Sequence, residues 1–447
     1  MMFSNSKKII VLLFIFSLVI NIASMMSSSI LWWDEGVYTG LGWQLKDNFS
    51  DYSFKEFQDN IRDDWTQAGF RSPLLPYIIA IFYLLFNSNF IIRLIVPVVS
   101  SIGVIGLYFL AKKMFDNKVG LFSAIIMASL PIYTYYSGKI LTDVFYTTFI
   151  ILSVLFFWMG FEEGKNKYKI LCGLFCGLSI LGRYSGALII LVLFSYFIIK
   201  NKNFNFLKDK WLLISVGVFL LVLSPWLYYS YTAYGNPVGF IEHSHRASTY
   251  WGGLQNWDFI FLYFPSMFSF GVLLFFIGGF FMIKNKKIND KRNLLFLWFL
   301  VFVIFVSLFS QHKETRYIMG AIPAISIIAG YSIKKMNKKI VACLIVLILL
   351  TSMFSLYFQY SDTYGESHLC HLKGLEYIKN LEGGKVFSYS SPVSYFYTHK
   401  ESYSLYDLSV YDGKKYVLAS DIDGSEDFSN GIEIFNCRNT TMVFEVN

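Results

Sequence analysis

Long apolar runs separated by short polar connections fill the first 360 residues of the chain. Eleven of them approach the ~20 residues that a helix needs to cross ~30 Å of hydrocarbon. The runs are 9–29, 90–111, 119–136, 143–161, 168–182, 184–199, 211–230, 259–283, 293–310, 317–333 and 340–358. This pattern predicts a mostly α-helical, polytopic membrane protein with residues 1–360 as its membrane domain.

A twelfth apolar stretch, 73–86, is shorter and contains Pro73 and Pro76. It is more typical of an interfacial or re-entrant segment than of a span. If it does not cross, every inner connection is rich in Lys and Arg, and together these connections carry a net charge of +16. The outer segments carry −2, and residues 361–447 carry −6. The positive-inside rule then predicts a cytoplasmic N-terminus and an extracytoplasmic C-terminal domain in the cell membrane.

Composition agrees with a lipid environment. The chain is 55% hydrophobic and 15% charged, whereas a soluble chain has about 25% charged residues. This excludes a cytosolic enzyme and a disordered chain. The net charge of +8 lies mainly on membrane connections, so we expect the lipid bilayer, and no nucleic acid, as a partner. The first thirty residues also resemble a cleavable signal peptide, but a retained signal anchor is preferred.

Two outer regions are long enough to carry function. Residues 31–89 form an outer loop in which 51–64 is expected to be an amphipathic helix on the membrane surface. Residues 361–447 are expected to form a small α/β domain, with a helix near 369–381 and strands near 385–389, 416–419, 432–435 and 442–446. Cys370 and Cys437 could pair there in an oxidising compartment, although the sequence does not supply their distance.

Three polar clusters lie at the outer ends of predicted spans. The first contains Asp34 and Glu35 between aromatic residues, and its simpler interpretation is an aromatic belt with solvated acids. Asp143 opens the fourth span, where it could simply cap the helix. The third cluster, 312–317, could be an interfacial charge network with a snorkelling Lys313. Their shared face makes them candidates for one site.

In this order, the clusters resemble those of GT-C class membrane glycosyltransferases near the protein O-mannosyltransferase and aminoarabinose transferase families. Asp34-Glu35 matches the Asp-Glu pair of their first outer loop, and Asp143 matches the aspartate that opens their fourth span. Residues 312–317 are similar to a His-Lys-Glu-x-Arg-Phe element, and 71–76 loosely match a Pro-rich segment. Where the families have His, Lys or Glu before those prolines, this chain has Phe-Arg-Ser. The resemblance covers about residues 1–340.

The resemblance implies transfer of a sugar, mannose or a similar hexose or pentose, from a polyprenyl- or dolichyl-phosphate carrier. The acceptor would be a protein, lipid or glycan on the outer face, and the transfer would invert the anomeric centre. An acceptor hydroxyl needs a base, for which Asp34 is the candidate, with Glu35 and Asp143 as orienting groups. A phosphate leaving group needs cations. Candidates are Arg71, Arg183, Lys313 and Arg316 for the donor phosphate, and Trp33, Tyr38, His312, Glu314 and Tyr317 for the sugar or acceptor.

Two other interpretations stay open. Glu242, His243 and His245 could hold a divalent metal, although such a pattern is more often a polar surface turn. A transporter or a flippase of lipid-linked oligosaccharides is the alternative function. A transporter would place ionisable groups at mid-membrane, whereas the midsections of these spans are almost free of charge. The pattern therefore favours the transferase.

Overall fold

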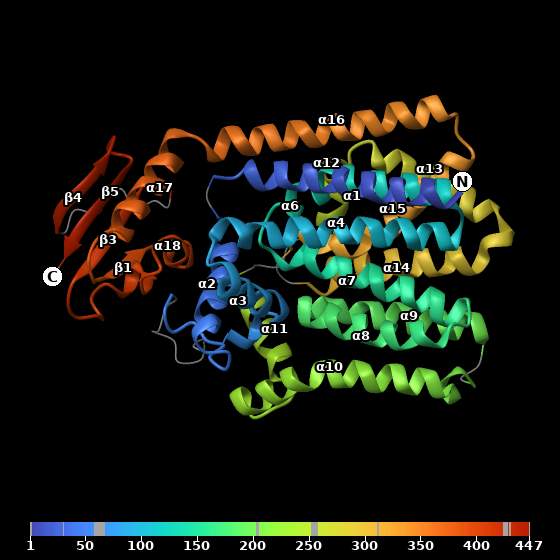
Figure 1. The fold of residues 1–447 in the computed structure, drawn as a ribbon, viewed down its shortest axis with the longest axis horizontal. Coiled ribbons are helices and arrows are strands. Elements are labelled where there is room, and N and C mark those ends of the chain that lie inside the picture. Colours follow the sequence, from blue (N-terminus) through green and yellow to red (C-terminus); the bar gives the residue numbers. More distant parts are fainter. Residues whose placement is uncertain are drawn as a thin grey trace.

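Figure 1 shows a bundle of long helices with a small sheet domain at one end. It is a computed structural model that describes residues 2–29, 31–57, 68–202, 205–251, 258–310, 313–422, 428 and 431–446. The helices of the first 363 residues are α1 Met2–Met26, α2 Trp33–Asp47, α3 Leu74–Phe86, α4 Asn89–Met114, α5 Asn117–Ser129, α6 Pro131–Ser137, α7 Thr142–Phe157, α8 Asn166–Gly182, α9 Leu188–Asn201, α10 Lys210–Tyr234, α11 Gly239–Trp251, α12 Phe259–Phe268, α13 Gly271–Lys284, α14 Asn289–Leu308, α15 Ile322–Tyr331 and α16 Lys338–Thr363.

The helices confirm a polytopic membrane fold. Within the described residues, eight helical stretches are long and apolar enough to cross a membrane, or ten if two bent pairs are each one span. The bent pairs, at 117–137 and 261–284, coincide with two of the eleven expected runs. The remaining expected run, 168–182, lies in α8, which has 17 residues. The twelfth stretch forms the short α3, which has 13 residues and is too short to count among the candidate spans.

The bend between α5 and α6 follows from the sequence. Pro131 begins α6, and a residue before proline is pushed out of the helical conformation. Leu130 accordingly has an extended backbone, and the two helices meet at 64°. The bend brings the end of α6 and the segment 138–141 toward the start of α7, where Asp143 lies.

The two ends of the chain lie at opposite ends of the molecule (Figure 1). Helices α2, α3 and α11 gather at the end that faces the sheet domain. The loop helices and the C-terminal domain therefore share one side of the membrane region.

The C-terminal residues form a small α/β unit. It contains α17 Glu366–Lys379, β1 Lys385–Ser388, α18 Ser391–Thr398, β2 Ser402–Ser404, β3 Lys415–Ser420, β4 Ile432–Cys437 and β5 Thr441–Val446. The strand order is β2-β1-β3-β5-β4, with β1 parallel to both neighbours and β5 antiparallel to both of its own. The expected strands are therefore present, and α18 and β2 are additional.

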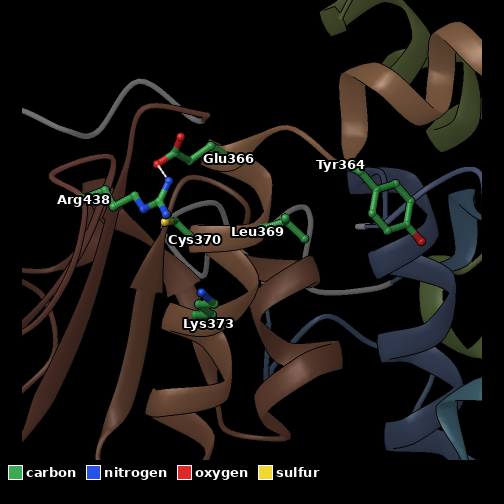
Figure 2. A pocket seen from close by; sticks show the side chains of 6 residues that line it. All are labelled: Tyr364, Glu366, Leu369, Cys370, Lys373 and Arg438. Carbon is green, nitrogen blue, oxygen red and sulfur yellow. Dashed lines mark hydrogen bonds and ion pairs between the residues drawn. The ribbon is translucent and has the colours of Figure 1, made fainter.

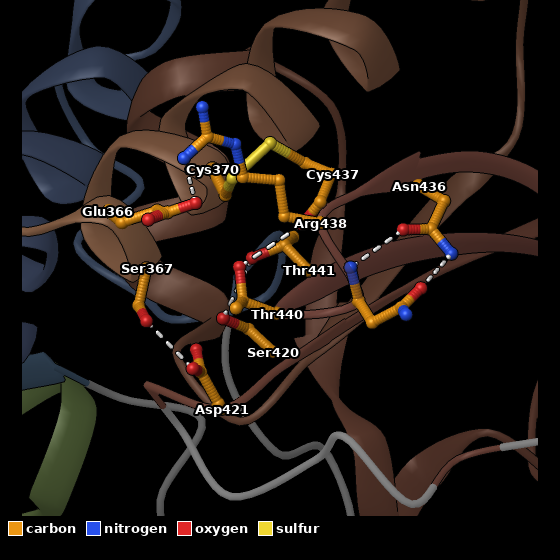
Figure 3. Close-up of a disulfide and its surroundings, with 11 residues drawn as sticks. Glu366, Ser367, Cys370, Ser420, Asp421, Asn436, Cys437, Arg438, Thr440 and Thr441 are labelled. Carbon is orange, nitrogen blue, oxygen red and sulfur yellow. Dashed lines mark hydrogen bonds and ion pairs between the residues drawn. A yellow bond between two sulfur atoms is a disulfide. The ribbon is translucent and has the colours of Figure 1, made fainter.

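A disulfide between Cys370 of α17 and Cys437 of β4 closes this unit, so the pairing that the sequence left open is formed (Figure 3). Figure 2 shows the residues that line a hollow beside it, where Arg438 is paired with Glu366. The hollow is lined by Tyr364, Glu366, Leu369, Cys370, Lys373 and Arg438.

The expected amphipathic helix at 51–64 is wrong for its described part. Residues 51–57 form no helix, and 58–64 lie outside the described residues. The side chains of Phe54 and Phe57 are buried in an aromatic cluster with Tyr395 of α18 instead of lying on a membrane surface. Burial against the C-terminal unit overrides the helical spacing of the apolar residues.

Candidate active site

The site begins at the first turn of α2, where Asp34 and Glu35 have different surroundings. Glu35 is buried and accepts hydrogen bonds from the backbone N–H groups of Trp32 at 3.0 Å and Ile140 at 2.7 Å. It therefore caps α2 and ties it to the segment that precedes Asp143. Asp34 is 18% exposed at its side chain and points its carboxylate at two arginines.

Two arginines from distant segments hold the two oxygens of Asp34. Arg71 lies 3.0 Å from Oδ1, and Arg316 lies 2.6 Å from Oδ2. Arg316 also donates to Glu314 at 2.7 Å. The first loop and the connection before α15 thus meet at one carboxylate.

A second ion pair lies next to the first. Arg183 follows α8 and contacts Oδ1 of the buried Asp143 at 2.7 Å, and it donates to the Thr142 hydroxyl at 3.3 Å. Nε of Arg316 is 4.0 Å from Oδ2 of Asp143, so Arg316 joins both carboxylates. Three arginines and two aspartates that the sequence placed far apart form one network.

The backbone around Arg71 is fixed by hydrogen bonds to its carbonyls and by a link to the end of α8. The Tyr184 hydroxyl donates to the carbonyls of Gly69 at 2.5 Å and Arg71 at 3.1 Å. Ser72 donates to the carbonyl of Gly182 at 2.8 Å. The turn that carries Arg183 therefore also positions Arg71. Tyr184 was not among the predicted site residues, although it directly follows Arg183.

Aromatic rings line the arginines. The Arg71 guanidinium lies 5.7 Å from the Trp33 ring and 5.8 Å from the Tyr38 ring, and Arg183 lies 4.7 Å from the Tyr317 ring. Tyr38 is buried at 5% exposure, which leaves Trp33 as the more accessible face for a sugar. Such cation–π contacts stabilise the guanidinium positions.

The electrostatics of Asp34 are decided by its neighbours. Burial raises the pKa of this carboxyl, but the charges of Arg71, Arg316 and Arg183 outweigh burial and hold the pKa well below its usual range. For Arg71, burial lowers the pKa of the guanidinium, but nearby groups, the negative charge of Asp34 first, raise it by more. The pKa is therefore above its usual value, and the guanidinium stays charged. The resting site therefore contains an ionised carboxylate bound to cations.

Lys139 is a charged group near the site to which the sequence gave no role. It is 1% exposed, and its Nζ lies 3.9 Å from the Trp32 ring. Among the described residues Nζ has no hydrogen-bond partner. Burial lowers the pKa of Lys139 to about 8, opposed by the charge of Glu35. Its signal in the sequence was a lysine on the outer side, among the apolar residues before Asp143.

The other predicted residues lie in different surroundings. Lys313 is buried, and His312 lies outside the described residues. Glu242, His243 and His245 lie on α11. Because residues two apart on a helix do not face each other, His243 and His245 point in different directions. Glu242 pairs with Arg246, and His243 stacks on Tyr234. No group of three or more His, Cys, Asp or Glu side chains that could hold a metal occurs in the described residues, so the metal hypothesis gains no support.

Comparison with solved structures shows which known fold this architecture has. ArnT from Cupriavidus metallidurans bound to undecaprenyl phosphate superposes with a TM-score of 0.78 over 97% of both chains, at 14% identity. The Archaeoglobus fulgidus oligosaccharyltransferase gives a TM-score of 0.60 over 92% of this chain and 69% of that chain, at 12% identity. This chain has the GT-C fold.

Sequence comparisons agree with this fold. The pattern of the dolichyl-phosphate-mannose-protein mannosyltransferase family matches residues 70–229, which include Arg71, Asp143 and Arg183. An uncharacterized protein of Aquifex aeolicus (strain VF5) is 32% identical over 121 residues, which are 27% of this chain and 26% of that protein. The expected resemblance to GT-C glycosyltransferases is confirmed.

Proposed function

We propose that this chain is a membrane glycosyltransferase that moves a sugar from a polyprenyl-phosphate carrier to an acceptor, with inversion at the anomeric carbon. One observation carries the proposal: Arg71, Arg183 and Arg316 converge on Asp34 and Asp143 at an end of the helical bundle. Arginine presents the two-pronged geometry that suits phosphate oxygens. A carboxylate beside the bound phosphate is placed to accept the proton of an attacking hydroxyl.

In this mechanism the acceptor oxygen attacks the anomeric carbon from the face opposite the phosphate. The bond from that carbon to the acceptor oxygen forms as the carbon–oxygen bond to phosphate breaks. Asp34 takes the acceptor proton, and polyprenyl phosphate leaves with the bonding electrons. Arg71 and Arg316 stabilise the additional negative charge on the leaving phosphate. Asp143 holds Arg183 in place, and Glu35 fixes the helix that carries Asp34.

The likeness to a structure with bound undecaprenyl phosphate supports the choice of carrier. The matching family pattern supports mannose or a related sugar, and a protein as one acceptor class beside lipids and glycans. If the acceptor were itself a phosphate, it would arrive ionised, and Asp34 would position it without taking a proton. In the proposed orientation, the N-terminus is cytoplasmic and the C-terminal domain is extracytoplasmic.

The test is transfer by the purified chain in lipid nanodiscs. Radiolabelled polyprenyl-phosphate-mannose is supplied with membrane extracts of a strain that lacks the gene, and labelled products are identified by mass spectrometry. Asp34→Asn should lower transfer by at least 100-fold, the scale of a lost general base. Asp47→Asn removes the same charge at the exposed end of α2 and serves as the matched control. Full transfer by Asp34→Asn would remove Asp34 as the base.

A further inference from the structure

Both oxygens of Asp34 are occupied by the arginines that are proposed for the donor phosphate. Arg316 donates a hydrogen bond to Oδ2 at 2.6 Å, and Arg71 forms an ion pair with Oδ1 at 3.0 Å. The Nε atoms of both arginines are buried, and neither has a hydrogen-bond partner among the described residues. Each arginine therefore retains a donor beside the carboxylate that it contacts.

This arrangement is in conflict with a simultaneous role for Asp34 as base. A carboxylate that is bound by two guanidinium groups is a weak proton acceptor, because they stabilise its ionised form. A two-pronged contact of Arg71 or Arg316 with a phosphate through the unpaired Nε would also use the Nη2 atom that now contacts Asp34. Asp34 and the donor phosphate therefore compete for the same two guanidinium groups.

We propose that Asp34 stands in for the donor phosphate in the resting protein, and that donor binding takes Arg71 and Arg316 from it. The inference rests on the proposed function. A lipid-phosphate sugar is a phosphodiester with one negative charge, so it would replace Asp34 with a group of equal charge in contact with the arginines. The carboxylate that is released becomes a stronger base at the moment when the anomeric carbon is in place.

The neighbouring ion pair is suited to stay intact during this exchange. Arg183 is held by Asp143 at 2.7 Å and by the Thr142 hydroxyl at 3.3 Å, and neither contact involves Asp34. Arg316 also keeps its hydrogen bond to Glu314, at 2.7 Å. This bond anchors the guanidinium while its contact with Asp34 is replaced. The exchange therefore needs movement of the Asp34 side chain and little else. It makes the donor bind before the acceptor is activated.

The test measures the affinity of undecaprenyl phosphate for the purified full chain in detergent, by microscale thermophoresis. If Asp34 competes with phosphate, Asp34→Asn should bind this probe about tenfold more tightly, equivalent to one charged hydrogen bond. Asp47→Asn is the matched control, because it lies on the same helix, about 20 Å away along the axis. Its affinity should equal that of the unmodified chain.

The outcomes separate this inference from the proposed function. If the unmodified chain binds the probe and Asp34→Asn binds it equally or more weakly, the competition is overturned while the proposed carrier stands. If the unmodified chain does not bind the probe, the proposed carrier is wrong, and this inference falls with it. Thermal unfolding of each variant reports folding, and Asp34→Ala replaces Asp34→Asn if the latter does not fold.

Discussion

Arg316 and Asp34 are 282 residues apart in the sequence, and their side chains meet at 2.6 Å. The Arg316 side chain is 8% exposed and also contacts Glu314 and Asp143. A buried cation with several acidic partners is costly to remove, because the partners remain as uncompensated charges. Arg316 is therefore the centre of the network.

Arg316→Ala should weaken binding of undecaprenyl phosphate and lower sugar transfer by about 10²–10³-fold, the scale of a lost donor to a developing anion. Binding and transfer assays on the same preparation check this. Arg246→Ala removes an exposed arginine on α11 and is the control. Unchanged donor affinity in Arg316→Ala would exclude its assignment to phosphate.

Gly36 allows α18 to pack directly on α2. A Cβ at Gly36 would lie 2.7 Å from the backbone carbon of Pro392 and the backbone nitrogen of Val393. Gly36→Ala should therefore lower the free energy of unfolding by about 1–3 kcal/mol and lower transfer, since Asp34 is two residues away. Thermal unfolding and transfer assays test both effects.

Gly217→Ala is the matched control for this contact. Gly217 lies inside α10, and a Cβ there would meet no atom within 4 Å. Alanine is the better helix former, so this change should leave stability equal or raise it by up to about 1 kcal/mol. Equal behaviour of the two variants would contradict a functional contact between α18 and α2.

The Cys370–Cys437 disulfide spans a sequence separation of 67 residues. Closing a loop of that length restricts the unfolded chain and contributes about 4 kcal/mol. Replacing both cysteines by serine should therefore lower the unfolding temperature of the C-terminal unit, and reductant should have the same effect on the unmodified chain. The free Cys343 is the control, because Cys343→Ser should retain the response to reductant.

His371 makes the C-terminal unit sensitive to acid. It is 1% exposed, and burial lowers its pKa to about 4, aided by His368 and opposed by Asp421. The unfolded state binds more protons between the ordinary pKa of 6.5 and 4, so stability falls as the pH drops through this window. The loss is about 3 kcal/mol at most. Between pH 7 and pH 4.5, the His371→Leu variant should lose less free energy of unfolding than the unmodified chain. An equal loss in both would exclude His371 as the cause.

The proposed orientation can be tested with a membrane-impermeant thiol reagent on intact cells. Asn48→Cys and Lys118→Cys place thiols at exposed positions of the outer loop and of a basic connection, in a Cys343→Ser background. Only the first should react before the membrane is permeabilised, because the positive-inside rule puts Lys118 in the cytoplasm. Labelling of both from the same side would overturn the topology.

Features of the fold that depend on a few neighbouring residues could be predicted from the sequence, and features that depend on contacts between distant segments could not. Apolar runs act over a few residues, so the runs around α4 and α7 could be located in advance, whereas 119–136 was expected as one run and is bent at Pro131. The helix expected at 51–64 was wrong because its apolar spacing is equally suited to packing against α18. Periodicity reports that a face is buried but not what covers it.

The sequence by itself determined that the chain spans a membrane and that Asp34, Asp143 and Arg316 are candidates for one site, and it predicted that the basic connections lie on one side. Only the tertiary structure decided which arginine contacts which carboxylate, that Glu35 is a cap, and that Lys139 and Tyr184 lie beside the network. The physical reason is that hydrophobicity and charge are properties of short segments. An ion pair depends on distances of about 3 Å between atoms that helix packing brings together.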